Sequence, residues 1–170
     1  MIYIIGIIAV LLGVALDQYT KYLAISHLQD NPISIIEDVF QLRYLENRGA
    51  AFGLLQNQQV FFLLVGCITL FFIAYLYIRM PQTRRFVLLR ICMISVTAGA
   101  IGNMIDRVRF QYVVDFLYFE LIDFPIFNVA DIFATLATFG LIFLLLFYYK
   151  EEEIDLLFQL LSPKSKKIQE

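Results

Sequence analysis

Two aspartates are the residues best suited to chemistry in this chain, and they are sixteen positions apart. Asp115 lies between valines and aromatic residues, in a segment typical of a short strand. Asp131 lies one turn into an apolar run that is long enough to cross a membrane. A carboxylate at the edge of hydrocarbon is costly to accommodate, so such a residue is a functional candidate by default.

Two carboxylates that share a poorly hydrated site do not both ionise readily, because their negative charges repel. They tend to hold one proton between them. One group can then take a proton from water while the other donates to the substrate carbonyl. Asp115 and Asp131 therefore predict an aspartic hydrolase that needs no metal. Because such a pair titrates as a unit, neither residue is assigned as the acid or the base.

The composition requires an environment other than water for much of the surface. Apolar residues make up 61% of the chain and charged residues 16%, against about 45–50% and about 25% in soluble domains. The net charge of −2 gives no support for a nucleic-acid partner. Cys67 and Cys92 lie in apolar runs without a CxxC pattern, and His27 is the single histidine. No metal cluster or cofactor is expected.

Four stretches are long and apolar enough to be membrane-spanning helices. They cover approximately residues 2–25, 60–78, 86–105 and 129–149. No repeat or linker divides the chain, so residues 1–170 are expected to form one mainly α-helical membrane domain. The first stretch lacks a basic leader and runs on into Asp17 and Lys21, so it is interpreted as a retained helix rather than a signal peptide.

Charge indicates the orientation of the four spans. The link between the second and third carries arginines and no acid, which predicts a cytoplasmic location. Both termini and the tail 150–170 then also lie in the cytoplasm. Segments 26–59 and 106–128 each sum to −2 and are expected on the outer face.

Two local patterns complete the expected architecture. Alternation in residues 40–45 predicts strands, and hence a small extracytoplasmic sheet on the membrane. In the tail, Ile154, Leu157, Phe158 and Leu161 recur at helical spacing before Pro163. That spacing predicts an amphipathic helix lying on the inner leaflet.

Polar residues within the first span have two interpretations. Asp17, Thr20 and Lys21 share one helix face near its outer end. In one interpretation, Lys21 extends its ammonium to the interface and pairs with Asp17. In the other, the pair orients a loop or the substrate main chain. The two interpretations are compatible.

Small and polar residues also share one face of the third span, namely Ser95, Gly99, Gly102, Asn103 and Asp106. Small residues allow another helix to approach closely. Asn103 and Arg107 are one turn apart, and an asparagine within a span needs a polar partner. This face predicts either a structural hydrogen-bond network or a polar pocket that faces the two carboxylates.

Asn128 and Asp131 have the spacing of a helix N-cap, in which an asparagine is followed three residues later by an acid. Their face continues through Thr135 and Thr138, which favours a functional role. Capping by Asn128 would then hold the site rigid.

Two other functions fit parts of the pattern. A Ser-Lys hydrolase would use Lys21 with Ser26 or Ser95, although neither serine lies in a recognisable motif. An ion- or proton-coupled carrier would use intramembrane acids as relay groups, namely Asp17, Asp106 and Asp131. The absence of an internal sequence repeat argues against a carrier.

Five motifs occur in an order that closely resembles bacterial lipoprotein signal peptidase, also called signal peptidase II. They are Asp17-Gln18-Tyr19-Thr20-Lys21, Asn47-Arg48-Gly49-Ala50-Ala51-Phe52, Gly99-Ala100-Ile101-Gly102-Asn103-Met104-Ile105-Asp106-Arg107, Val113-Val114-Asp115-Phe116 and Phe127-Asn128-Val129-Ala130-Asp131. The resemblance spans residues 17–131. One departure is Ala98, where the family often has glycine, and this exchanges one small residue for another.

The resemblance implies an aspartic endopeptidase of the bacterial cytoplasmic membrane, with its active site at the outer face. Such enzymes remove the signal peptide of prolipoproteins by cutting before a diacylglyceryl-modified cysteine, with the lipid chains in the bilayer. Asp115 and Asp131 become the catalytic residues, and inhibitors of the globomycin type are expected to block the site. Supporting or substrate-contacting roles fall to Asp17, Lys21, Asn47, Gly49, Asn103, Arg107 and Asn128.

Overall fold

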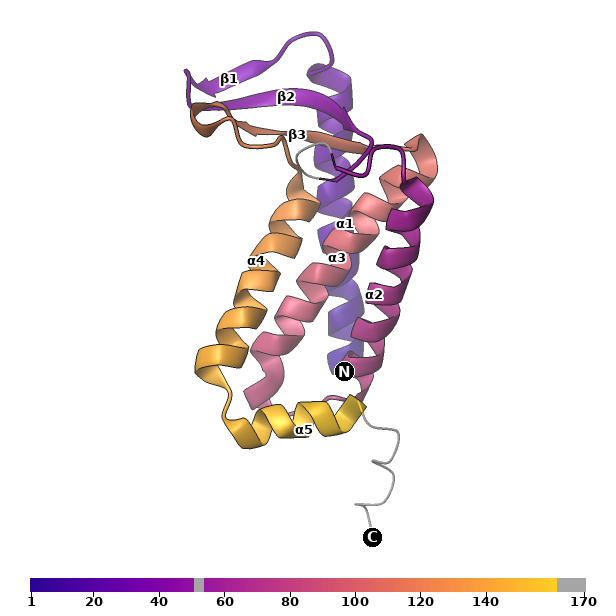
Figure 1. The fold of residues 1–170 in the computed structure, drawn as a ribbon, viewed down its shortest axis with the longest axis vertical. Coiled ribbons are helices and arrows are strands. Elements are labelled where there is room, and N and C mark those ends of the chain that lie inside the picture. Colours follow the sequence, from indigo (N-terminus) through magenta and orange to yellow (C-terminus); the bar gives the residue numbers. More distant parts are fainter. Residues whose placement is uncertain (51–53, 162–170) are drawn as a thin grey trace.

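The computed structural model describes residues 1–50 and 54–161, which form a helical bundle with a small sheet at one end (Figure 1). Four long helices run along the bundle: α1 (Ile2–His27), α2 (Gln59–Arg79), α3 (Val87–Phe110) and α4 (Val129–Phe143). A 3₁₀ turn η2 (Arg84–Phe86) precedes α3, and a π-helical turn η4 (Leu144–Tyr148) continues α4. The end of the second motif, and Pro163 with the residues after it, lie outside the described residues.

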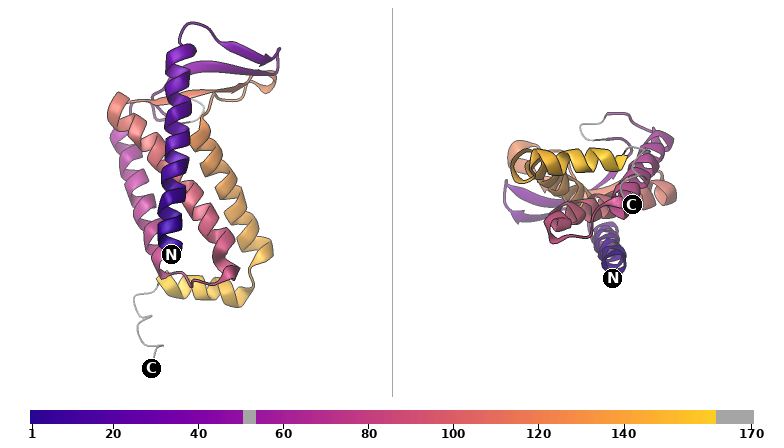
Figure 2. Two further views of the ribbon diagram at one scale, coloured as in Figure 1. Left: turned by 180° about the vertical axis from the view of Figure 1, so that it is seen from behind. Right: turned by 90° about the horizontal axis from the view of Figure 1, so that it is seen from below.

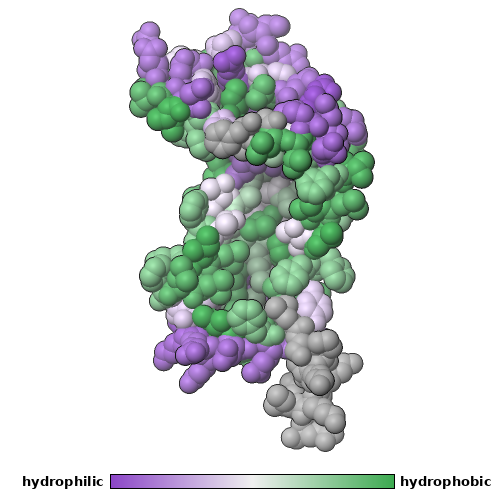
Figure 3. Space-filling view, viewed as in Figure 1, coloured by the Kyte–Doolittle hydropathy of each residue, from purple (hydrophilic) through white to green (hydrophobic). Residues whose placement is uncertain are grey.

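All four long helices are long and apolar enough to cross a membrane. Hydrophobic side chains gather around the middle of the bundle and hydrophilic ones at both ends (Figure 3). The predicted fold class, four such helices with a small sheet, is confirmed.

The third helix extends further than its apolar run. The predicted membrane span covers approximately residues 86–105, and the helix continues from there to Phe110 with Asp106 and Arg107 within it. The helix can continue beyond the apolar run because both side chains find partners inside the protein rather than in water. Gln111, in the left-handed region at φ 64°, ends the helix with its N–H bonded to the carbonyl of Arg107.

The glycine face of α3 is where two other helices approach most closely. A Cβ added at Gly99 would lie 2.5 Å from the carbonyl oxygen of Ala130, at the start of α4. A Cβ added at Gly102 would lie 2.4 Å from Oδ2 of Asp17 on α1. The predicted close approach at the small residues is therefore confirmed, and α3 is the central helix of the bundle.

The sheet consists of β1 (Ile33–Ile36), β2 (Phe40–Asn47) and β3 (Val113–Phe119), antiparallel in the order β1-β2-β3. The strands expected in residues 40–45 and around Asp115 are confirmed. In the register of β2 and β3, Asn47 lies opposite Val113 and Leu45 lies opposite Asp115. The end of β2 therefore lies beside the candidate aspartate.

A short return of the chain brings the start of α4 beside β3. After β3 comes the 3₁₀ turn η3 (Glu120–Ile122), and Phe127 then pairs with Leu117 through two backbone hydrogen bonds. The N–H of Phe127 donates to the carbonyl of Leu117 at 3.0 Å, and the N–H of Leu117 donates to the carbonyl of Phe127 at 2.8 Å. The next residue, Asn128, begins α4. Residues sixteen apart in sequence are thereby placed side by side.

A fifth helix, α5 (Glu151–Leu161), crosses the opposite end of the bundle from α4 toward α2 (Figures 1 and 2). The predicted tail helix is confirmed, but its apolar side does not simply face lipid. Ile154 and Leu157 pack against the hydrophobic cluster at that end, whereas Phe158 stays exposed.

Candidate active site

Asp115 and Asp131 line one cavity of about 560 Å³, between the sheet and helices α2, α3 and α4. Residues from two further elements meet them there. β2 and its following turn supply Asn47 and Gly49, whereas α3 supplies Asn103 and Arg107. Much of the remaining wall is apolar and includes Phe62, Phe124 and Leu136.

Asp131 is oriented by the N-cap of its own helix. The Oδ1 of Asn128 accepts the backbone N–H of Asp131 at 3.0 Å, and Oδ2 of Asp131 accepts the N–H of Asn128 at 3.1 Å. The other carboxylate oxygen accepts a hydrogen bond from Nδ2 of Asn103 at 2.8 Å. The predicted capping box is confirmed, and it fixes the carboxylate that lines the cavity.

Asp115 is held by two asparagines from different elements. Nδ2 of Asn128 donates to Oδ1 at 2.6 Å, and Nδ2 of Asn47 donates to Oδ2 at 2.8 Å. Asn128 therefore contacts both aspartates. Each of the four carboxylate oxygens accepts one of these bonds, and each has a second lone pair for water or substrate.

The environment of Asp115 favours its protonated form. Burial raises the pKa of Asp115 to about 7, with a further contribution from the negative charge of Asp131. The hydrogen bonds from Asn47 and Asn128 act in the opposite direction and limit the rise in pKa. Near neutral pH the pair can therefore hold one proton, as acid-base catalysis by two carboxylates requires.

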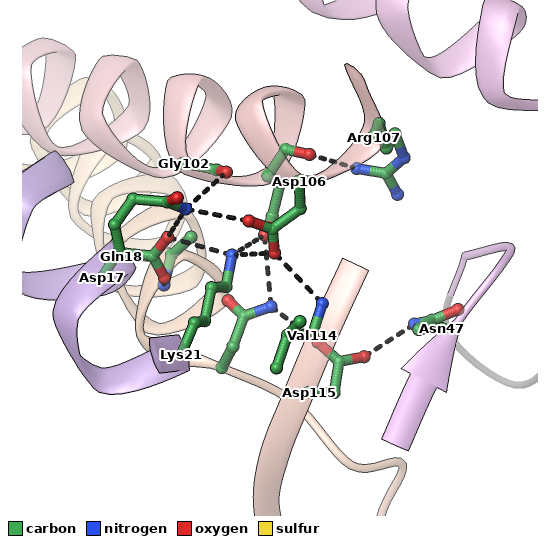
Figure 4. A network of polar contacts seen from close by, with 12 residues as sticks. Asp17, Gln18, Lys21, Asn47, Gly102, Asp106, Arg107, Val114 and Asp115 are labelled. Carbon is green, nitrogen blue, oxygen red and sulfur yellow. Dashed lines mark hydrogen bonds and ion pairs between the residues drawn. The ribbon is translucent and has the colours of Figure 1, made fainter. Parts of the chain in front are cut away.

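A buried ion cluster lies behind the pair (Figure 4). Nζ of Lys21 lies 2.9 Å from Oδ2 of Asp17, 2.9 Å from Oδ2 of Asp106 and 2.9 Å from Oδ1 of Asn103. The predicted pairing of Lys21 with Asp17 is confirmed. The expectation that Lys21 extends to the interface is wrong, because only 2% of it is exposed and the protein satisfies all three N–H groups.

The cluster holds the backbone on both sides of the site. Oδ2 of Asp106 accepts the N–H of Val114 at 3.1 Å, and Oδ1 of Asp17 accepts the N–H of Ala130 at 2.9 Å. Each of these N–H groups belongs to the residue immediately before a candidate catalytic aspartate. Lys21 thus connects, through two carboxylates, the strand and the helix that carry the pair.

Sequence reasoning left two members of this cluster out of the supporting set. Asp106 was assigned no role in the peptidase site, and Gln18 none at all. Nε2 of Gln18 donates to Oδ1 of Asp106 at 2.9 Å and to the carbonyl of Gly102 at 3.2 Å. The signal for Asp106 was its position on the polar face of α3, one turn from Asn103.

Arg107 and Gly49 complete the opposite side of the cavity. Nη2 of Arg107 donates to the carbonyl of Gly49 at 3.3 Å, and the N–H of Gly49 donates to Oδ1 of Asn47 at 3.0 Å. The guanidinium lies 4.5 Å from the ring centroid of Phe62. Within the described residues, Nε of Arg107 is buried without a partner. All nine residues singled out from the sequence therefore lie in or directly behind one site.

The Ser-Lys alternative has no support in this geometry. The three donors of Lys21 go to Asp17, Asp106 and Asn103. The Ser26 hydroxyl is directed to the carbonyl of Tyr22, 2.9 Å away on its own helix.

The fold and site define a multi-pass membrane hydrolase with paired carboxylates where its helices meet its sheet. Comparison with known proteins is consistent with this class. A family model described as "Signal peptidase (SPase) II" matches residues 8–147. The chain belongs to the signal peptidase II family and is a peptidase, which excludes the carrier alternative.

Similar proteins extend along most of the chain. A lipoprotein signal peptidase of Clostridium tetani is 41% identical over 151 residues, covering 86% of this chain and 93% of that protein. One from Clostridioides difficile is 43% identical over 143 residues, covering 84% and 95%. A solved structure described as a bacterial membrane enzyme by the in meso method at 2.3 Å is 32% identical, with a TM-score of 0.77 over 86% of this chain and 92% of that one.

Proposed function

We propose that this protein is an aspartic endopeptidase that removes the signal peptide from prolipoproteins by cutting before a diacylglyceryl-modified cysteine. The observation that carries the proposal is the pair Asp115 and Asp131, bridged by Asn128 in a single cavity. The relatives that match most of this chain are lipoprotein signal peptidases, which supports prolipoproteins as the substrate class.

In the proposed mechanism, the ionised carboxylate of the pair takes a proton from a water molecule. That water attacks the scissile carbonyl, and the protonated carboxyl donates to the carbonyl oxygen. The raised pKa of Asp115 supports a shared proton at neutral pH. Because the two groups are coupled, the proton belongs to the pair rather than to one residue.

Neighbouring polar groups fit roles in binding the peptide. Arg107 lines the cavity, and its bonds to the carbonyls of Asn103 and Gly49 use two of the five guanidinium N–H groups, so the side chain can also donate to a main-chain carbonyl of the substrate. Asn47, Asn103 and Asn128 hold the carboxylates and supply the preorganised donors of the site.

The orientation proposed from charge places the sheet outside and α5 in the cytoplasm. Arg79, Arg84 and Arg85 lie where α2 ends and α3 begins, at the α5 end, which supports a cytoplasmic position for that end. The start of α1 lies at the same end (Figure 1). The pair is then at the outer surface of the bacterial cytoplasmic membrane, and the acyl chains of the substrate lie in the bilayer beside the helices.

Binding of the acyl chains would place the scissile bond beside the pair, so that energy from groups remote from the reaction contributes to turnover. An inhibitor of the globomycin type would occupy the same cavity. Its apolar wall, with Phe62, Phe124 and Leu136, suits such a ligand.

The test is cleavage of a diacylglyceryl-modified prolipoprotein by the purified protein. Asp115→Asn and Asp131→Asn are each expected to lower turnover by about 10²–10⁴-fold, while substrate binding is retained. Asp30→Asn, an exposed site outside the network, is the matched control and should keep wild-type activity. If either pair variant folds and turns over near the wild-type rate, the proposed mechanism is wrong.

A further inference from the structure

A second cavity lies along the same faces of the helices that line the first. It has a volume of about 420 Å³. On each of three helices, residues that line the second cavity lie seven or fourteen positions from a residue that lines the first, which is a repeat of about two helical turns. The three series are Phe62, Thr69 and Leu76 on α2, Asn103, Val96 and Leu89 on α3, and Asp131, Thr138 and Leu145 on α4 and its continuation η4. The two cavities therefore lie in line between α2 and α4, along one side of α3, and together they are called the groove.

Helix α5 closes the lower end of this groove. Ile154, Leu157 and Phe158 line the second cavity from below. In Figure 1 and in the view from below in Figure 2, α5 runs from the end of α4 to the end of α2, on the side of α3 away from α1.

Polar contacts fix α5 to the connection between α2 and α3. Nη1 of Arg79 donates to the carbonyl of Leu160 at 3.1 Å, near the end of α5. Nε of Arg85 forms an ion pair with Glu153 at 2.7 Å, near its start. In α2, Gln59 is the single buried residue, so α5 is one of few elements that set the position of this wall.

The exposed side of α5 is acidic next to the groove. Glu151, Asp155 and Phe158 are spaced i, i+4 and i+7, so they share a helix face. Phe158 is 66% exposed although it lines the cavity. All three residues lie beyond residue 147, where the family match ends.

The substrate class of the proposed function has a shape that fits this groove. A signal peptide has an apolar segment of about 7–15 residues, preceded by a positively charged segment. A 15-residue helix is about 22 Å long, and the fourteen steps from Asp131 to Leu145 span about 21 Å at the same rise. When the cleavage site of the signal peptide lies at the pair, the start of its apolar segment reaches α5. The basic segment that precedes it then meets the acidic side chains of α5.

We propose that α5 is a substrate-selecting element, in which Phe158 contacts the start of the apolar segment while Glu151 and Asp155 bind the basic segment that precedes it. This proposal rests on the proposed function and orientation. The lower cavity supplies the apolar contact, its alignment with the candidate active site supplies the direction, and the charges supply the match at the lower end.

The charge contact is tested with the full-length protein in lipid nanodiscs and two prolipoproteins that share one apolar segment. One substrate carries three lysines before that segment and the other carries three glutamates. Glu151→Lys/Asp155→Lys should raise KM for the lysine substrate about threefold to tenfold, leave its kcat unchanged, and lower KM for the glutamate substrate. Asp30→Lys/Glu37→Lys makes the same change in net charge at the sheet end and should alter neither KM.

The apolar contact is tested by Phe158→Ala, with Phe147→Ala as its matched control. Phe158 and Phe147 are 66% and 74% exposed, and of the two only Phe158 lines the groove. Phe158→Ala should raise KM severalfold for both substrates, whereas Phe147→Ala should not.

The outcomes separate this inference from the proposed function. If the wild-type protein cleaves neither substrate, the proposed function is wrong. If it cleaves both and the α5 variants keep wild-type KM values, the function stands and the role of α5 is wrong. A charge variant that raises KM equally for both substrates also overturns the role of α5, because the effect would then not depend on charge complementarity.

Discussion

The carboxylate of Asp106 accepts the backbone N–H of Val114 at 3.1 Å, and Val114 immediately precedes Asp115. Asp17 makes the equivalent bond to Ala130, which immediately precedes Asp131. Lys21 is 2.9 Å from both carboxylates. One buried ammonium therefore couples the two backbone segments that bring the candidate catalytic groups together.

Asp106→Ala tests this coupling. The variant removes the acceptor for Val114, so Asp115 loses its fixed position and kcat should fall by about 10- to 100-fold, with KM nearly unchanged. Asp106→Asn keeps one acceptor oxygen and should lose less. Steady-state kinetics on a lipidated prolipoprotein provide the measurement, and a folded Asp106→Ala variant with full kcat would rule out positioning.

Lys21→Met is expected to destabilise the fold strongly. It leaves Asp17 and Asp106 buried beside each other without a counter-charge, which costs about 3–5 kcal/mol. Thermal unfolding in detergent should show a large loss of stability, part of which Asp17→Asn restores in the double variant. The exposed Lys150→Met is the control. Equal melting temperatures for Lys21→Met and wild type would contradict the ion cluster.

Turnover should fall as the pH rises above about 7, because the pair must keep one proton and the pKa of Asp115 is about 7. Asn47→Ala removes a hydrogen bond that lowers this pKa, so the alkaline limb should move upward by about one unit. The profile of kcat between pH 5 and 9 measures the shift, and Asn31→Ala is the control at an exposed loop. An alkaline limb that moves downward in Asn47→Ala would be inconsistent with the assigned hydrogen bond.

The same raised pKa predicts a dependence of stability on pH. An unfolded aspartate has a pKa of about 3.9, so between pH 4 and 7 the unfolded chain has released a proton that folded Asp115 retains. Stability therefore falls as pH rises through this window, by up to about 4 kcal/mol. Asp115→Asn removes this contribution, so its melting temperature relative to wild type should be higher at pH 8 than at pH 4.5. If the melting temperatures of Asp115→Asn and wild type differ by the same amount at both pH values, the pKa of Asp115 is not raised in the folded protein.

Gly99→Ala should separate the start of α4 from α3. The added Cβ would meet the backbone carbonyl of Ala130 at 2.5 Å, and backbone cannot move aside locally. Activity should be lost because Asp131 directly follows Ala130, so a displacement of Ala130 also displaces the Asp131 carboxylate. Gly140→Ala, whose nearest contact is the Cys92 sulfur at 3.1 Å, should be nearly neutral by the same cleavage assay. Wild-type turnover in Gly99→Ala would show that the approach is not tight.

The four helices were predictable because a long apolar run is a local property of the sequence. The strand at Asp115 followed from its β-branched and aromatic neighbours. Asp115 was identifiable because a carboxylate between apolar neighbours gains nothing from packing there. Asp131 also fits a helix cap, and it was singled out because its polar face continues through Thr135 and Thr138. The set of supporting residues came mainly from ordered motifs, although the polar face around Asn103 also indicated that a partner was needed.

Other features depend on contacts that no local pattern contains. The burial of Lys21 requires a second carboxylate, supplied by Asp106 from another helix. The extension of α3 to Phe110 requires that Asp106 and Arg107 be satisfied internally. The meeting of β3 and α4 depends on the return at Phe127, a three-dimensional relationship between short segments.

The bonding of Asn128 has a consequence for drug resistance. Its amide donates to Asp115 and Asn103, and its oxygen accepts from Asp131, so its hydrogen-bonding groups are all engaged by the site. A compound anchored on these side chains leaves a bacterium few escape substitutions, because a change that weakens the compound also disturbs the carboxylates. Resistance would then have to arise on the apolar wall of the cavity, where exchanging one hydrophobic residue for another costs the enzyme least.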